Sequence, residues 1–142
     1  MPASVRPADP GDRELLQQLL AEYLFEFDGS TEPYPYLDAY WTEPERRPFV
    51  IEEAGDVVGL CLIRVRAGGW WSIAEFYVVP GHRRGGAGRA AVDEVAALAR
   101  SAGASHLEAK VHPDNQQALP FWLSVGFEVV DAPGVVITRR VL

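Results

Sequence analysis

Residues 78–89 run Val78-Val79-Pro80-Gly81-His82-Arg83-Arg84-Gly85-Gly86-Ala87-Gly88-Arg89, an apolar segment that breaks at a proline into a basic, glycine-rich turn. An alanine-rich segment typical of a helix follows the turn. Glycines let backbone N–H groups approach a ligand closely, and a helix N-terminus favours an anion. The three arginines can add full positive charges around it. The stretch therefore predicts a strand, a turn and a helix that together bind a phosphate group.

Two other phosphate-binding patterns do not match this turn. It contains no G-x-x-x-x-G-K-[ST], which excludes a nucleoside-triphosphatase loop. Gly86-Ala87-Gly88 does not complete a G-x-G-x-x-G followed about twenty positions later by an acidic residue, as a dinucleotide site requires. The pattern that remains is Arg83-x-x-Gly86-x-Gly88.

A second motif lies near the C-terminus, where the chain runs Asn115-Gln116-Gln117-Ala118-Leu119-Pro120-Phe121-Trp122-Leu123-Ser124-Val125-Gly126-Phe127. Taken alone, it predicts only an amphipathic helix that begins at an asparagine cap and ends at a glycine. Pro120 lacks an N–H group, so it is expected to loosen or kink the start of this helix.

In this order, the two motifs resemble those of the GNAT-type N-acetyltransferase superfamily. The R-x-x-G-x-G pattern after a strand is similar to that family's acetyl-CoA pyrophosphate loop. Residues 115–127 are similar to its N-x-x-A-x-x-F-Y-x-x-x-G-F motif. The resemblance implies acetyl-CoA as co-substrate, and transfer of the acetyl group to a primary amine of a small molecule or protein that attacks the thioester directly.

The length of 142 residues predicts one domain spanning residues 1–142, because it supports one hydrophobic core rather than two. The expected order is strand, helices, three antiparallel strands, helix, strand, helix and two strands, a mixed α/β fold that matches the GNAT arrangement along nearly the whole chain. The resemblance implies a mostly antiparallel sheet of six to seven strands, flanked by about four helices, whose fourth and fifth strands splay apart. We expect strands at 5–6, 49–53, 57–66, 70–79, 106–111, 127–131 and 135–141, and helices at 9–27, 37–41, 88–102 and 115–125.

The resemblance also assigns residues to the co-substrate. Backbone groups around Phe76, Tyr77 and Val78 are expected to bind the pantetheine arm as an added strand would. The backbone N–H groups of the turn are expected to hold the pyrophosphate, with Arg83 and Arg89 beside it; the turn residues are Arg84, Gly85, Gly86, Ala87 and Gly88. Asn115 is expected to contact the arm, and Trp122 to lie next to it.

The expected reaction needs a base, because an alkyl amine has a pKa of about 10.4 and arrives protonated. Two glutamates on central strands qualify, Glu75 and Glu108. We favour Glu75, because a carboxylate in the apolar run Ile73-Ala74-Glu75-Phe76-Tyr77 should have a raised pKa suited to a base. Some members of the family carry a catalytic glutamate at the position of Glu108. A structural ion pair with an arginine or with Lys110 is the alternative role for either residue.

One residue departs from the family's pattern. Tyrosine is usual at the position of Trp122, where it can protonate the leaving thiolate. An indole N–H donates a hydrogen bond but is no acid at neutral pH. Water or one of the other tyrosines would then have to serve, and the sequence does not choose between them.

Charge and composition limit the partners. With a net charge of −7, the chain is not expected to bind nucleic acid, which requires clustered basic residues. Acidic and aromatic residues gather between Glu22 and Glu45, where they form either a site for a cationic acceptor or a solvated acidic surface. A single cysteine and three histidines without metal-ligand spacing predict no metal site.

The remaining expectations concern location and class. No run of about eighteen apolar residues occurs and the first residues lack an apolar signal segment, so we expect a cytoplasmic protein without a membrane anchor. By the resemblance, a homodimer is possible. A different class of function is a non-catalytic acyl-CoA-binding or regulatory module, which the tryptophan at position 122 could reflect.

Overall fold

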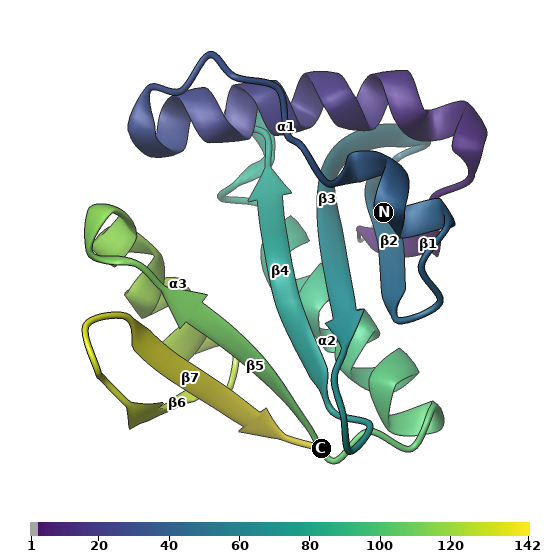
Figure 1. Ribbon diagram of the computed structural model, residues 1–142. Coiled ribbons are helices and arrows are strands. Elements are labelled where there is room, and N and C mark those ends of the chain that lie inside the picture. Colours follow the sequence, from purple (N-terminus) through teal and green to yellow (C-terminus); the bar gives the residue numbers. More distant parts are fainter. Residues whose placement is uncertain (1–2) are drawn as a thin grey trace.

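The computed structural model describes residues 3–142, which form one seven-stranded sheet with helices on both faces (Figure 1). The strands follow the order β1-β2-β3-β4-β5-β7-β6 across the sheet. They are β1 (Ser4–Pro7), β2 (Arg46–Glu53), β3 (Asp56–Val65), β4 (Trp71–Val78), β5 (His106–Val111), β6 (Glu128–Asp131) and β7 (Val136–Val141). The helices are α1 (Arg13–Asp28), α2 (Ala87–Ser101) and α3 (Leu119–Ser124), together with the 3₁₀ helices η1 (Pro10–Asp12), η2 (Leu37–Trp41), η3 (Pro80–His82) and η4 (Pro113–Ala118). The mixed α/β fold and its mostly antiparallel sheet confirm the prediction.

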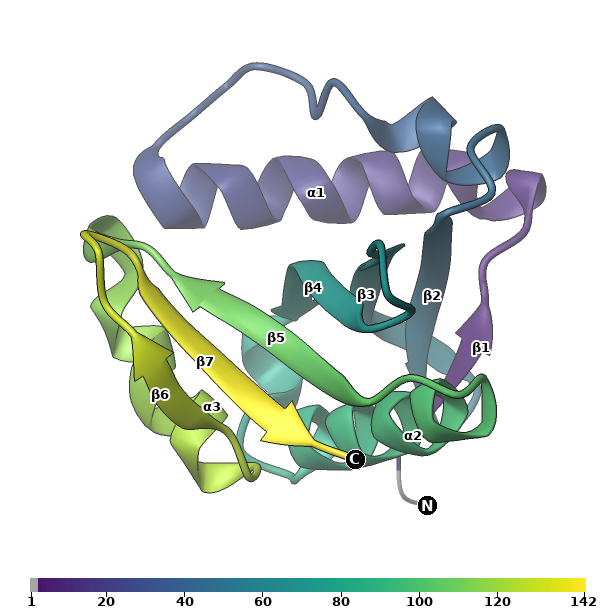
Figure 2. The same ribbon diagram turned by 60° about the horizontal axis from the view of Figure 1, so that its bottom comes forward.

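Helix α1 covers one face of the sheet and α2 covers the opposite face (Figure 2). Leu16, Leu19 and Leu20 of α1 pack with Leu60 and Leu62 of β3, and all five are at most 4% exposed. On the other face, the small residues of α2 allow it to lie close against the sheet. The sheet therefore has one apolar core on each face, one beneath α1 and the other beneath α2.

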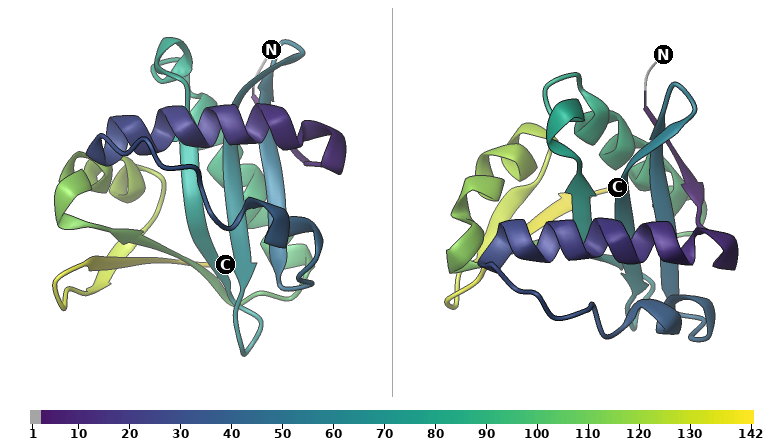
Figure 3. Two further views of the ribbon diagram at one scale, coloured as in Figure 1. Left: turned by 45° about the horizontal axis from the view of Figure 1, so that its top comes forward. Right: turned by 90° about the horizontal axis from the view of Figure 1, so that it is seen from above.

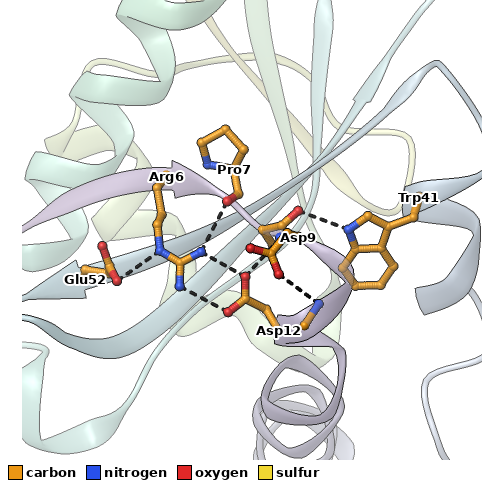
Figure 4. Close-up of polar contacts among 8 residues, drawn as sticks. Arg6, Pro7, Asp9, Asp12, Trp41 and Glu52 are labelled. Carbon is orange, nitrogen blue, oxygen red and sulfur yellow. Dashed lines mark hydrogen bonds and ion pairs between the residues drawn. The ribbon is translucent and has the colours of Figure 1, made fainter.

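A charged network ties the first strand to the first helices (Figure 4). The Arg6 guanidinium donates to the Asp12 carboxylate at 2.8 Å and to the Glu52 carboxylate at 3.0 Å. Asp9 caps η1 by accepting a hydrogen bond from the Gly11 N–H. The start of α1 is thus fixed to the β1–β2 edge of the sheet.

Strands β4 and β5 pair only briefly before they diverge (Figure 1). Their parallel pairing runs from Trp71 opposite Leu107 to Ile73 opposite Ala109, and no later residue of β4 pairs with β5. All other neighbouring strands in the sheet are antiparallel. The splayed strands that the resemblance implied are therefore present, and the second half of β4 presents a free backbone edge.

A β-bulge at Ala74 coincides with the point of divergence. On β3, Ile63 lies opposite Ile73 and Leu62 lies opposite Glu75, so Ala74 is an extra residue in β4. A bulge bends a strand and increases its twist. It also shifts the alternation by one, so that Glu75 faces α1 rather than sharing the face of Ile73.

The predicted helix at 115–125 is the one element that differs clearly. It is divided into η4 and the short α3, and Asn115 adopts a non-helical conformation with φ −134° and ψ 39°. Pro120 occupies the first turn of α3, where the missing N–H is tolerated. The proline therefore starts a new helix instead of continuing one from Asn115.

The proline-rich segment after α1 has little regular structure apart from η2, as predicted. It runs back alongside α1 before it enters β2 (Figure 3). Trp41 fastens its far end by donating an indole hydrogen bond to the Ala8 carbonyl at 3.0 Å.

Candidate active site

Two cavities meet where β4 and β5 diverge. The first has a volume of about 620 Å³ and lies between the segment after α1 and the sheet; the second has a volume of about 370 Å³ and lies between β4 and the η4–α3 segment. Six residues line both: Tyr23, Phe27, Ile73, Ala74, Lys110 and Asn115. The two cavities are therefore adjacent, with these six residues forming their common boundary.

The second cavity contains the predicted co-substrate residues of β4. Phe76, Tyr77 and Val78 line it along the strand edge that β5 leaves free. Trp122 and Phe121 also line it, and their rings pack directly against that of Phe76, with centroids 5.3 and 5.5 Å away. A flexible chain can lie in this groove and pair with the free edge as a further strand would.

The glycine turn closes one end of the second cavity. Gly86 has φ +84°, a left-handed conformation that side chains disfavour. At Gly88 a side chain is excluded for a different reason, since a Cβ there would lie 2.9 Å from the Phe121 ring. The first N–H groups of α2 have no partner within the helix, so they are available to an anion. Gly85 is exposed and Ala87 is buried.

The arginines of this turn have more specific roles than the sequence predicts. The Arg83 guanidinium makes a bidentate ion pair with Glu26 of α1 at 2.6 and 2.7 Å. Arg89 donates to the Ser124 carbonyl at 2.6 Å, which ties α2 to α3. Within residues 3–142, Arg84 forms no ion pair and is exposed. Two of the three cations therefore connect the elements around the turn, and Arg83 also lines the second cavity, whereas Arg84 lines neither.

Glu75 lies in the wall of the first cavity, close to its junction with the second. Its Oε2 atom is buried and has no hydrogen-bond partner among the described residues. Burial raises the pKa of this carboxyl from its ordinary value of 4.5 to about 7. A proton acceptor that titrates near neutrality thus faces the cavity.

Glu108, the other candidate base, has a different environment. Arg139 donates to its Oε2 at 2.7 Å, and His106 Nε2 lies 3.3 Å from the same atom. Glu108 lines neither cavity, although its strand borders both. The structure thus gives Glu108 the ion pair that the sequence left as an alternative, and within residues 3–142 it gives Glu75 none.

Tyr23 of α1 is a site residue that the sequence analysis missed. It lines both cavities, and its phenol has a raised pKa because of burial and the nearby Glu75 carboxylate. Its spacing on the apolar face of α1 predicted a core residue and gave no sign of this position. Trp122, by contrast, lines only the second cavity.

The carboxylates of the acidic segment from Glu22 to Glu45 mostly lie at the surface, where Asp38 pairs with Arg13 and Glu43 pairs with Arg46. Asp28 is the member of this run that lines the first cavity. The segment supplies aromatic rings to the site instead, because Tyr34, Tyr36 and Tyr40 all line that cavity. Of the two alternatives for this segment, a solvated acidic surface therefore describes most of its charge.

Basic side chains line the first cavity in place of most carboxylates of the acidic segment. Arg46, Arg64, Arg66 and Lys110 line the first cavity from three strands and the end of β3. The sequence holds a signal for two of them, since Arg64 and Arg66 continue the alternation of Leu60 and Leu62 on the face toward α1.

Neither a metal site nor a membrane span is seen in the described part of the chain. Residues 3–142 contain no group of three or more His, Cys, Asp and Glu side chains that could hold a metal ion. Their helices also lack the combination of length and apolar character needed to cross a bilayer.

Comparisons with known proteins agree with this architecture. The Acetyltransferase (GNAT) family pattern matches residues 13–127. The fold is similar to that of an acetyltransferase from Thermus thermophilus, with a TM-score of 0.85 at 24% identity over 100% of this chain and 98% of that one. A GNAT-family acetyltransferase from Staphylococcus aureus gives 0.83 at 13% identity over 99% of each chain. The PaiA N-acetyltransferase of Thermoplasma acidophilum, solved in complex with coenzyme A, gives 0.80 at 14% identity over 100% of each chain. The comparison with curated protein sequences gives no match.

Proposed function

The chain belongs to the acetyltransferase (GNAT) family, and from that premise we propose that it transfers the acetyl group of acetyl-CoA to a primary amine. The observation that carries the proposal is the junction of the two cavities beside Glu75. One cavity suits the thioester substrate, the other suits the amine, and an unpartnered carboxylate lies where the two would react.

The second cavity fits an acyl-CoA in three respects. The free edge of β4 supplies backbone partners for the amide groups of a pantetheine arm. The N-terminal turn of α2 supplies N–H groups for a pyrophosphate, with Arg84 as a nearby cation. Asn115 and Trp122 border the groove between these two places.

Glu75 is proposed as the base. The amine arrives protonated, and Glu75 removes that proton, directly or through a water molecule. The nitrogen lone pair then attacks the carbonyl carbon of the thioester. The C–S bond breaks with its electron pair on sulfur, and the nitrogen releases its second proton to water, which leaves a neutral amide and CoA thiolate. Because Glu75 must be ionised to accept the proton, the rate should rise with pH through about 7.

Tyr23 is proposed to stabilise the leaving thiolate. Its phenol keeps its proton at neutral pH because its pKa is raised. A thiolate has a conjugate acid of pKa about 8.5, below that of the phenol, so a hydrogen bond is favoured over full proton transfer. This assigns to α1 the role that a tyrosine at position 122 would have had.

Release of free thiol from acetyl-CoA across a panel of primary amines tests the reaction. We expect Glu75→Gln to lower kcat by a factor of about 100 or more while the Kd for CoA stays unchanged. Glu108→Gln is the matched control, because it removes an equal charge from a neighbouring strand but should keep kcat within about threefold. Equal losses in the two variants would contradict the role of Glu75.

The same samples separate an enzyme from a binding module. Thermal stabilisation by acetyl-CoA without thiol release from any amine would support a non-catalytic acyl-CoA-binding protein. If neither acetyl-CoA nor CoA raises the melting temperature, both functions are wrong.

A further inference from the structure

Three arginines occupy one wall of the first cavity. Arg46 of β2 lies directly opposite Arg64 of β3 in the sheet register. Arg66 follows two positions later, just beyond the end of β3, and also lines the cavity. Like charges placed opposite one another on neighbouring strands destabilise a sheet. The arrangement is costly unless an anion offsets it.

Among the described residues, the protein supplies a carboxylate partner to only one of these three arginines. Within residues 3–142, neither Arg64 nor Arg66 forms an ion pair, and the Nε atom of each is buried without a hydrogen-bond partner. Arg46 has one partner, Glu43 at 3.0 Å, which does not line the cavity. A buried donor without an acceptor costs about 1–3 kcal/mol. The wall therefore has buried hydrogen-bond donors without acceptors, and a bound oxyanion would supply those acceptors.

Aromatic rings hold the first of these cations in position. The Arg46 guanidinium lies over the rings of Tyr36 and Tyr40, at 5.7 and 5.0 Å from their centroids. Stacking on an aromatic face leaves the edge of a guanidinium free to donate hydrogen bonds. The tyrosines thus support the basic wall without neutralising it.

The basic wall lies at a short distance from Glu75. Arg64 is opposite Ser72 on β4, while Leu62, two residues before Arg64, is opposite Glu75. Arg64 and Glu75 are therefore diagonal neighbours on one face of the sheet, about 7–8 Å apart along the backbone. A single small molecule can span that distance with an amine at one end and an anionic group at the other. The other acidic residues of this cavity besides Glu75 are Asp28 and Asp114, which come from the C-terminus of α1 and from η4.

We propose that the acceptor is a small amine that also carries a carboxylate or phosphate, and that Arg46, Arg64 and Arg66 bind this anionic group. The proposal rests on the function proposed above. The cavity volume of about 620 Å³ suits a small molecule. The amine end lies toward Glu75 and the second cavity, and the anionic end lies against β2 and β3.

Pairs of amines that differ only in the anionic group test this. 4-Aminobutanoate is compared with its amide, and O-phosphoethanolamine with ethanolamine, in the thiol-release assay. We expect the anionic member of at least one pair to show a kcat/KM about tenfold higher or more, because charge-assisted bidentate bonds discriminate strongly. The pair with the larger ratio identifies the group as carboxylate or phosphate. Ratios near one in both pairs, or a preference for dicationic amines, would overturn the proposal while leaving the acetyltransferase intact.

Two variants assign the effect to the wall. Arg64→Met should raise the KM of the anionic amine about tenfold and leave that of its neutral partner within about twofold. Arg47→Met is the matched control, since Arg47 is the next residue to Arg46 on β2, is exposed and lines neither cavity. Equal effects of the two substitutions would overturn the assignment.

A binding measurement keeps this proposal separate from the proposed function. With CoA saturating, O-phosphoethanolamine or 4-aminobutanoate should raise the melting temperature of the parent protein but not of Arg64→Met. This shift without any thiol release would support the anion site and contradict acetyl transfer. Thiol release with neither this shift nor selectivity for the anionic amines would support acetyl transfer and contradict the anion site.

Discussion

Arg6 on β1 and Arg64 on β3 carry the same guanidinium on the same sheet, yet their surroundings differ. Arg6 lies between two carboxylates, Asp12 and Glu52 (Figure 4). Arg64 faces another arginine across the strand pair and has no ion pair within residues 3–142. The first cation holds secondary-structure elements together, whereas the second contributes repulsion to the folded state. Of these two arginines, the one with matched charges belongs to the scaffold and the one without lines the first cavity.

The two glutamates of the central strands repeat this contrast. Glu108 is paired with Arg139, while the Oε2 atom of Glu75 is buried and has no hydrogen-bond partner within residues 3–142. A carboxylate that destabilises the fold and has a perturbed pKa is found most often at a functional site. The contrast therefore supports the same assignment of roles that the two arginines suggest, and it can be tested by removing each charge in turn.

The largest effect is expected from Glu75→Gln, which should make the protein more stable above neutral pH. Since the pKa of Glu75 is raised from 4.5 to about 7, the folded state binds its proton more tightly than the unfolded state. Stability is therefore lost as the pH rises between these two values. The variant should exceed the parent by about 3 kcal/mol in the free energy of unfolding above pH 7, and by almost nothing below pH 4.5. Urea unfolding across this pH range measures the difference. A constant difference would mean that ionisation of Glu75 is not its source.

Arg6→Met should act in the opposite direction. Removing the guanidinium leaves Asp12 and Glu52 without their cation, and the Asp12 side chain is only 14% exposed. Allowing for the 38% exposure of Arg6 itself, we expect a loss of about 2 kcal/mol in the free energy of unfolding. Arg6 also lowers the pKa of Asp12 below its ordinary value of 3.8, so this stabilisation should fade as the pH falls below that value. Chemical unfolding at neutral and at acidic pH checks both parts. A loss independent of pH would point to packing of the Arg6 stem instead.

Glu108→Gln should destabilise the protein by about 1 kcal/mol, since Arg139 is 41% exposed and water replaces part of the lost ion pair. Thermal and urea unfolding measure the change beside the Glu75 variant. The informative result is the sign, because removing one strand carboxylate should stabilise the fold and removing the other should weaken it. If both changes weaken it, the distinction between matched and unmatched carboxylates fails.

The smallest effect on stability is expected from Arg64→Met. The substitution removes a like-charge contact with Arg46 and leaves no carboxylate unpaired. The free energy of unfolding should change by less than about 0.5 kcal/mol, or rise slightly. Urea unfolding beside Arg6→Met provides the comparison. A loss as large as that of Arg6→Met would place Arg64 in the scaffold and remove the basis for a bound anion.

The features that the sequence predicts well are local ones. The turn around Gly86 and the helix after it depend on residues within a few positions, and apolar alternation locates the strands. The ion pair of Arg83 joins residues 57 positions apart, and the hydrogen bond of Arg89 spans 35. No local pattern indicates that these two cations are already occupied by the protein.

The sequence likewise predicts only part of the candidate site, because the rest depends on contacts between residues far apart in the chain. The chemical character of Glu75 follows from its apolar neighbours in the strand. The position of Tyr23 depends on how α1 crosses the sheet, and the basic wall depends on a register that pairs Arg46 with Arg64. The arginines were overlooked because a charged residue near a strand end usually lies in solvent.

Ala74 shows that the site also depends on the number of residues in β4. If Ala74 alone were deleted, the strand would alternate regularly, and Glu75 and Phe76 would keep the faces that they have now. Pairing with β5 could then continue past Ile73 and cover the edge that is now free. Such a chain would retain each acid, arginine and aromatic ring named above and still lose its groove. The number of residues in β4 therefore matters as well as their types, because one extra residue marks the point where the strand's edge becomes free.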